Sequence, residues 1–142
     1  IAVSRSYATL AVAVFALVQM GASAGEPHVS FRRDVAPVLT TSCSTRSCHG
    51  GMRSPMLGAK DDAAKLRASL LTEASDEQRV LPFVRPGAPD KSWLVAKVEG
   101  HLEGHDCVDH DCGDAMPLDN PSLSPENIRT IRSWIAQGAQ DN

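Results

Sequence analysis

The chain has few aromatic side chains and no cluster of basic ones. Aromatic residues make up 4% of its 142 residues, which is little for a core built from side chains alone. The net charge is −3 and the longest basic run is the pair Arg32 and Arg33, so the electrostatic footprint of a nucleic-acid-binding protein is missing. The length suits one compact domain and excludes a multidomain enzyme.

The sequence also lacks an apolar run long enough to span a membrane. Residues 8–20 are apolar except for Thr9 and Gln19, whereas a spanning helix needs ~20 apolar residues. Arg5 precedes this run, and four small residues, 21–24, follow it. The pattern predicts a signal peptide over residues 1–24 and one exported domain over residues 25–142, periplasmic or otherwise secreted, without stable membrane insertion.

Apolar residues recur at helical spacing near both ends of this domain. Ser30 is placed to cap a helix, and Pro37 either kinks that helix or begins a new one. Ser124 and Pro125 are typical of a helix start, and Gly138 of a helix end. The apolar positions of these two predicted helices are Phe31, Val35, Val38, Leu39, Ile128, Ile131, Trp134 and Ile135.

Two shorter helices are expected between them, over residues 61–71 and after a loop at residues 84–92. Their candidate core positions are Ala64, Leu66, Leu70, Leu71, Trp93, Leu94, Ala96 and Val98. No segment has the alternating pattern of a strand. The sequence therefore predicts a small all-α domain with long loops.

Cys43, Cys48 and His49 carry the most informative pattern. Outside the cytoplasm, cysteines are usually paired, metal-bound or covalently modified. Two cysteines followed by a histidine are similar to the haem-attachment motif C-x-x-C-H, with four intervening residues here instead of two. Because residues five apart do not share a helix face, residues 44–47 would loop out and a helix would begin near Cys48. A Cys43–Cys48 disulfide is the alternative.

The wider context of this motif resembles a known family. In order, the chain contains Phe31-x-x-Asp34-Val35-x-Pro37-Val38-Leu39, Cys48-His49-Gly50, Pro86-Gly87-x-Pro89-x-x-Ser92-x-Leu94, Met116-Pro117, Leu123-Ser124-x-x-x-Ile128 and Trp134-Ile135-x-x-Gly138-Ala139. This order resembles small class I-like c-type cytochrome domains of exported planctomycete and myxobacterial proteins, over roughly residues 30–139. The resemblance implies a cytochrome c-like fold wrapped around one covalent haem c. It also implies thioether anchors at Cys43 and Cys48, with His49 and Met116 as axial iron ligands.

Met116 suits the distal position on physical grounds as well. Imidazole and thioether ligands together suit iron to electron transfer, and the thioether raises its potential. Met116 lies in a polar stretch with no apolar helix face to join, whereas Met52 and Met56 are too near His49 in sequence to reach the opposite face easily. The competing sixth ligands are His101, His105 and His110, each otherwise an ordinary solvated histidine.

Cys107 and Cys112 have the same spacing as the first pair, but no histidine follows them. We expect a local disulfide that holds the loop just upstream of Met116. A zinc site formed by all four cysteines is the alternative. The acidic residues nearby lack the glycine and the closing glutamate of an EF-hand calcium loop, and we interpret them as a solvated loop. They are Asp106, Asp109, Asp111 and Asp114.

These observations predict an exported mono-haem electron carrier that exchanges electrons with redox partner proteins, and not an enzyme. Trp134, Ile131 and Leu94 are expected to pack against the haem. Two other hypotheses remain open at this point. One is a haem-free, disulfide-stapled interaction module, and the other is a haem enzyme or sensor in which Met116 leaves the distal position open.

Overall fold

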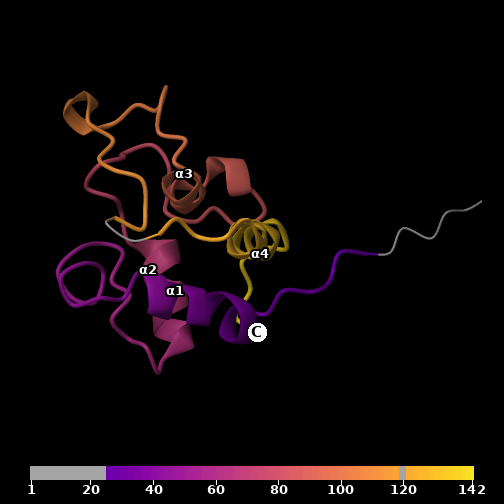
Figure 1. The fold of residues 1–142 in the computed structure, drawn as a ribbon. Helices are drawn as coiled ribbons and strands as arrows, with labels where there is room; N and C mark the ends of the chain where they lie inside the picture. Colours follow the sequence, from indigo (N-terminus) through magenta and orange to yellow (C-terminus); the bar gives the residue numbers. More distant parts are fainter. Residues whose placement is uncertain (1–24, 119–120) are drawn as a thin grey trace, which may run out of the picture.

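The computed structural model describes residues 25–118 and 121–142, and these form a small all-α domain with long loops (Figure 1). The predicted signal peptide and its cleavage site lie outside the described residues. Across the described part of the chain, the only β-pairing is an isolated bridge between Gln78 and Cys107, and there is no strand. No helix in that part is long and apolar enough to cross a membrane.

Four α-helices and three short helical turns make up the domain. The α-helices are α1 (Ala36–Ser42), α2 (Ala63–Thr72), α3 (Trp93–Glu99) and α4 (Pro125–Ala136). A π-helical turn, η1 (Phe31–Val35), precedes α1, and two 3₁₀ turns are η2 (Pro89–Lys91) and η3 (Val108–His110). The loop expected at residues 84–92 therefore contains one helical turn.

Proline and serine set the helix starts as the sequence predicts. The Ser30 hydroxyl oxygen accepts a hydrogen bond from the Arg33 amide at 3.2 Å. Pro37 has no N–H to continue a regular helix, so η1 closes with a wider bond from the Ala36 amide to the Phe31 carbonyl, and α1 then begins. The boundary between these two helical elements therefore lies just before Pro37, at Val35 and Ala36. Ser124 caps α4 in the same way, through the Asn127 amide at 3.1 Å.

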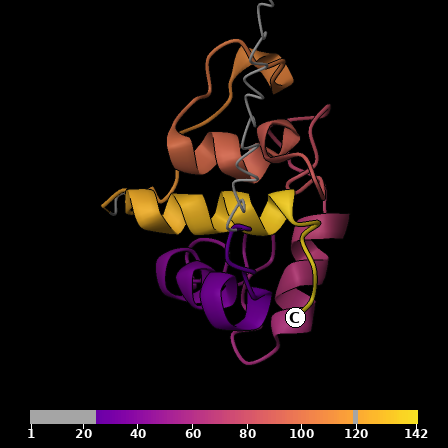
Figure 2. The same ribbon diagram turned by 90° about the vertical axis from the view of Figure 1, so that its right-hand side faces the viewer.

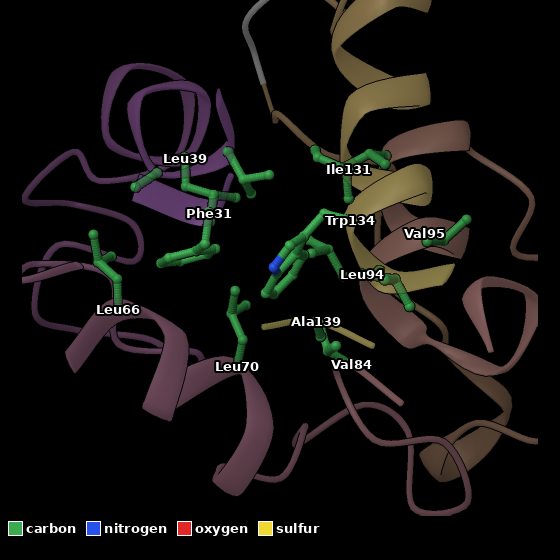
Figure 3. Close-up of a cluster of buried hydrophobic side chains, with 14 of the residues drawn as sticks. Phe31, Leu39, Leu66, Leu70, Val84, Leu94, Val95, Ile131, Trp134 and Ala139 are labelled. Atoms are coloured by element: carbon green, nitrogen blue, oxygen red, sulfur yellow. The ribbon is translucent and has the colours of Figure 1, made fainter. Parts of the chain in front are cut away.

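Helix α4 lies between α3 on one side and the η1–α1 segment on the other, with α2 alongside (Figure 2). The Trp134 ring packs against the Phe31 ring with centroids 4.8 Å apart, and Leu66 and Leu70 of α2 complete this part of the core (Figure 3). Ala64 is exposed and Leu71 only half-buried. Leu71 nevertheless packs against the core cluster, so the expected α2 core is wrong only at Ala64.

Candidate functional site

A cavity is lined by residues of α3 and of the loops that follow α1 and α3. Its empty volume is about 960 Å³, a figure that includes open solvent at the mouth. Cys43, Cys48 and His49 line it from one segment, and Met116 lines it from a segment far along the chain. Apolar side chains complete much of the wall, namely Leu57, Phe83, Trp93, Leu94 and Val98.

The cavity wall differs from the sequence expectation in which large apolar residues it uses. Leu94 lines the cavity as expected, but Trp134 and Ile131 lie in the helical core and are not among the lining residues. The reason is that α4 is enclosed by α3 and η1, so its apolar face is already covered. Trp93, the residue directly before Leu94, is the tryptophan that lines the cavity instead.

The segment that carries both cysteines is a series of turns, and not the start of a helix. Cys43 ends α1, with its amide bonded to the Leu39 carbonyl at 2.9 Å. The amides of Cys48 and Gly50 both donate to the Thr45 carbonyl, at 3.0 and 2.9 Å. The predicted helix at Cys48 is therefore wrong, because this shared acceptor closes a tight turn where a helix would need successive acceptors.

Ser44 also departs from the expectation that residues 44–47 loop out. Its side chain is buried, and its hydroxyl donates to the Leu57 carbonyl at 2.5 Å. Residues 45–47 are exposed. Ser44 thus joins the cysteine segment to the far end of the following loop.

Gly50 is required by a close backbone approach. A Cβ atom at this position would lie 2.5 Å from the Thr45 carbonyl oxygen and 2.7 Å from that of Ser44. Both distances are shorter than real Cβ contacts, and backbone atoms cannot move aside as a flexible side chain would. The glycine after His49 therefore allows the turn that presents Cys48 and His49 together.

His49 has a defined hydrogen-bond acceptor. Its Nδ1 lies 3.2 Å from the Arg53 carbonyl oxygen. Because a carbonyl can only accept, this contact selects the tautomer with the proton on Nδ1 and leaves the Nε2 lone pair for another ligand. The Leu57 amide donates to the His49 carbonyl at 2.6 Å, so the backbone of the residue is fixed as well.

Cys43 and Cys48 are both free thiols in this structure, and the alternative disulfide between them is not formed. Burial, with a smaller contribution from Cys48, raises the pKa of the Cys43 thiol to about 11. Cys43 is therefore protonated at neutral pH, and its sulfur is a neutral group within a partly apolar wall.

Met116 reaches the cavity because its backbone is attached to α3. Its amide donates to the Lys97 carbonyl at 2.8 Å, and its side chain is half-buried. Met52, by contrast, is 73% exposed, and neither Met52 nor Met56 lines the cavity.

The three histidines considered as sixth ligands lie elsewhere, since none is among the lining residues. His105 packs edge-on against the Trp93 ring, with centroids 5.2 Å apart. His101 lies 3.4 Å from the Glu99 carboxylate, and His110 is exposed. Of the candidate distal ligands, Met116 is thus the one that shares a cavity with His49.

The predicted Cys107–Cys112 disulfide is present, with a Cα–Cα distance of 5.2 Å. Since these two sulfurs are bonded to each other, a zinc site formed by four cysteine thiolates is not compatible with this structure. The Cys112 carbonyl accepts a hydrogen bond from the Lys97 ammonium at 3.0 Å. The disulfide loop and the Met116 backbone are therefore attached to the same residue of α3.

The buried ion pair between Lys97 and Glu77 in the cavity wall was not predicted from the sequence. Lys97 is almost fully buried, and its Nζ lies 2.7 Å from a carboxylate oxygen of Glu77 and 5.5 Å from the centroid of the Trp93 ring. A lysine inside the otherwise apolar run of α3 was the only available signal. Trp93 is itself notable because its Nε1 is the one buried side-chain polar atom, among those of the described residues, that has no hydrogen-bond partner.

The four predicted site residues line one cavity. Among the residues that the structure describes, no three His, Cys, Asp or Glu side chains are grouped closely enough to hold one metal ion directly. The chain matches no protein-family model, no curated protein and no solved structure. The residues and this geometry therefore carry the functional argument by themselves.

Proposed function

We propose that this chain is an exported mono-haem c-type cytochrome that carries electrons between redox partner proteins. Cys43 and Cys48 would hold the haem covalently, and His49 and Met116 would bind its iron. When bound, the haem supplies a one-electron couple at the iron. The observation that carries the proposal is that these four side chains, from two segments far apart in sequence, line one cavity.

His49 fits the role of a proximal ligand through its second nitrogen. A histidine that binds a metal almost always donates its other ring N–H to a fixed acceptor, which sets the tautomer and raises the basicity of the ligating nitrogen. The Arg53 carbonyl, 3.2 Å from Nδ1, is such an acceptor. The Nε2 atom is then available for iron.

Met116 fits the distal role because its neutral thioether is a soft ligand that favours reduced iron. Its backbone bond to α3 holds the residue at the cavity without using the side chain. A protein-held sixth ligand excludes water and small molecules from the iron, which suits an electron carrier better than an enzyme or a sensor.

The two free thiols fit covalent attachment. Each thiol would add across one vinyl group, with the sulfur bonding to one carbon and the thiol hydrogen passing to the other, so the addition requires no oxidant. Burial raises the pKa of the Cys43 thiol to about 11, so this thiol keeps its hydrogen even at mildly alkaline pH.

The test is the intact mass of the mature protein, produced by export in cells able to mature c-type cytochromes. We expect one haem that survives acid and organic extraction, and a red protein with a sharp reduced α-band. The Cys43→Ala variant should retain some haem through Cys48, whereas His49→Ala should lose the proximal ligand. Unmodified, colourless polypeptide from such cells would reject the proposal in favour of a haem-free module.

A further inference from the structure

We propose that Glu73 is a positioning residue for His49, acting through the loop that contains the histidine's hydrogen-bond acceptor. The inference rests on the proposed function, because its consequence is a change at a haem iron. Its structural part, however, concerns only the residues of this chain. It can therefore be tested whether or not the haem proposal holds.

Glu73 follows the last residue of α2 and points its carboxylate at the loop after His49. A single oxygen, Oε2, accepts hydrogen bonds from the Ser54 hydroxyl and from the Met56 amide, both at 2.9 Å. The two donors stand on either side of Pro55, which is buried. One carboxylate oxygen therefore attaches the centre of this loop to the end of a core helix.

The hydrogen bonds to Glu73 begin one residue after Arg53, whose carbonyl accepts the hydrogen bond of His49. The Arg53 carbonyl, which faces His49 Nδ1 at 3.2 Å, belongs to the peptide that leads directly into Ser54. Arg53 itself is exposed and has no hydrophobic anchor of its own. Its carbonyl is thus held from the Ser54 side by Glu73.

The remaining contacts hold His49 from the opposite side. The Leu57 amide donates to the His49 carbonyl at 2.6 Å, and the Ser44 hydroxyl donates to the Leu57 carbonyl at 2.5 Å. Without Glu73, these bonds would keep the His49 backbone in its turn while the loop at residues 53–56 gained freedom. Removing Glu73 would therefore loosen the Arg53 carbonyl, which is the acceptor of the imidazole, before it loosened the backbone of His49.

The expected consequence is a change in ligand basicity. A fixed acceptor on Nδ1–H raises the basicity of Nε2, and partners of this kind tune the metal. Loosening the Arg53 carbonyl makes His49 a weaker donor to iron and favours the reduced state. The Glu73→Ala variant should therefore have a higher midpoint potential than the wild type. Because this substitution also removes a charge, the effect of the charge must be measured separately from that of the hydrogen bonds.

Glu73→Gln makes that separation. Glutamine keeps a carbonyl oxygen that can accept both hydrogen bonds but carries no charge. The difference between Glu73→Ala and Glu73→Gln therefore measures the hydrogen bonds, and the difference between Glu73→Gln and wild type measures the charge. Glu103→Ala, which removes an exposed carboxylate outside this network, is the matched control.

The first measurement is amide hydrogen exchange at Met56 in the mature protein, together with the ¹⁵N spectrum of the His49 ring. Hydrogen bonds to charged groups contribute about 1.5–3 kcal/mol, so Met56 exchange should be at least about tenfold faster in Glu73→Ala. Glu103→Ala should stay near the wild type, and Glu73→Gln, whose neutral carbonyl accepts weaker hydrogen bonds, should lie between the wild type and Glu73→Ala. The Nδ1–H signature of His49 should weaken in Glu73→Ala alone.

The second measurement is the midpoint potential of the same variants. A rise in Glu73→Ala beyond that in Glu73→Gln supports the proposal, and equal shifts in the two would overturn it. Wild-type exchange at Met56 in Glu73→Ala would also overturn it, in red or colourless protein alike. If Glu73→Ala does not fold, Ser54→Ala removes one of the two bonds and should change exchange and potential in the same direction, to a smaller extent.

Discussion

The helical core and the cavity wall are held by different kinds of interaction. Around Trp134, the core consists of apolar side chains from η1, α2 and α4 in direct contact. The wall is built largely from turns, joined by polar contacts such as Ser44 to Leu57, His49 to Arg53 and Lys97 to Cys112. Leu57, Leu94 and Val98 belong to both regions. The comparison teaches that the core depends mainly on apolar contact, whereas the geometry of the site depends mainly on polar contacts between turns.

The largest expected effect on stability is in the core. Trp134 is 1% exposed, packs on Phe31 and donates from Nε1 to the Gln140 carbonyl at 3.0 Å. Trp134→Ala should lower the free energy of unfolding by about 3–5 kcal/mol. Urea denaturation measures this, and Met52→Ala, at a 73% exposed site, should change it by less than about 0.5 kcal/mol.

A second prediction concerns the disulfide, which belongs to the wall. Replacing both Cys107 and Cys112 by serine should cost about 2 kcal/mol, because the loop that the bond closes is short. Since Lys97 joins this loop to the Met116 backbone, carbon monoxide should also reach the haem iron faster. Unchanged ligand binding in the double variant would show that the disulfide does not support the site.

The core was largely predictable from the sequence because its signals are local. Ser30, Pro37 and Ser124 mark helix starts through their own backbone chemistry, and the spacing of Ile131, Trp134 and Ile135 gives the buried face of α4. Ala64 was misplaced because spacing along α2 does not reveal which of its faces η1 and α1 cover.

The wall was predictable only in part. Residue type and spacing indicated Cys43, Cys48, His49 and the Cys107–Cys112 pair, and the resemblance to small c-type cytochrome domains added Met116. The contacts between segments gave no local pattern. Glu73 reaches Ser54 and Met56, and Lys97 reaches Glu77 across 20 positions of sequence, so only the folded chain reveals them.

A third prediction uses the Cys43 thiol to report covalent attachment. Burial raises the pKa of this thiol to about 11. At pH values between the ordinary thiol pKa and about 11, the folded state therefore keeps the Cys43 proton that the unfolded state has lost. In protein with a free Cys43, the free energy of unfolding should therefore be unaffected below the ordinary pKa and fall by about 1–2 kcal/mol as pH rises to 11.

Denaturation at several pH values checks this. Cys43→Ala removes the titrating group and should abolish the alkaline decrease. A thioether-linked Cys43 should abolish it too, because the sulfur then has no proton to lose. If the decrease is equally large in wild type and Cys43→Ala, another group causes it.

The smallest expected effect on stability is at Met116. This half-buried side chain lies outside the core, so Met116→Ala should change the free energy of unfolding by less than about 1 kcal/mol. Its effect on the site should be large, with faster binding of small ligands and a lower midpoint potential. Met56→Ala is the matched control, since Met56 does not line the cavity.

The central claim is that His49 and Met116, which line one cavity, would both bind the iron of one haem, and the near-infrared spectrum of the oxidised protein tests it most directly. The account predicts the weak charge-transfer band of histidine–methionine haem in wild type and Met56→Ala, and its loss in Met116→Ala. A wild type that lacks the band and binds carbon monoxide at once would contradict the account and indicate an open site. A wild type that lacks the band yet resists carbon monoxide would instead assign the sixth position to a histidine of the loop at residues 101–110.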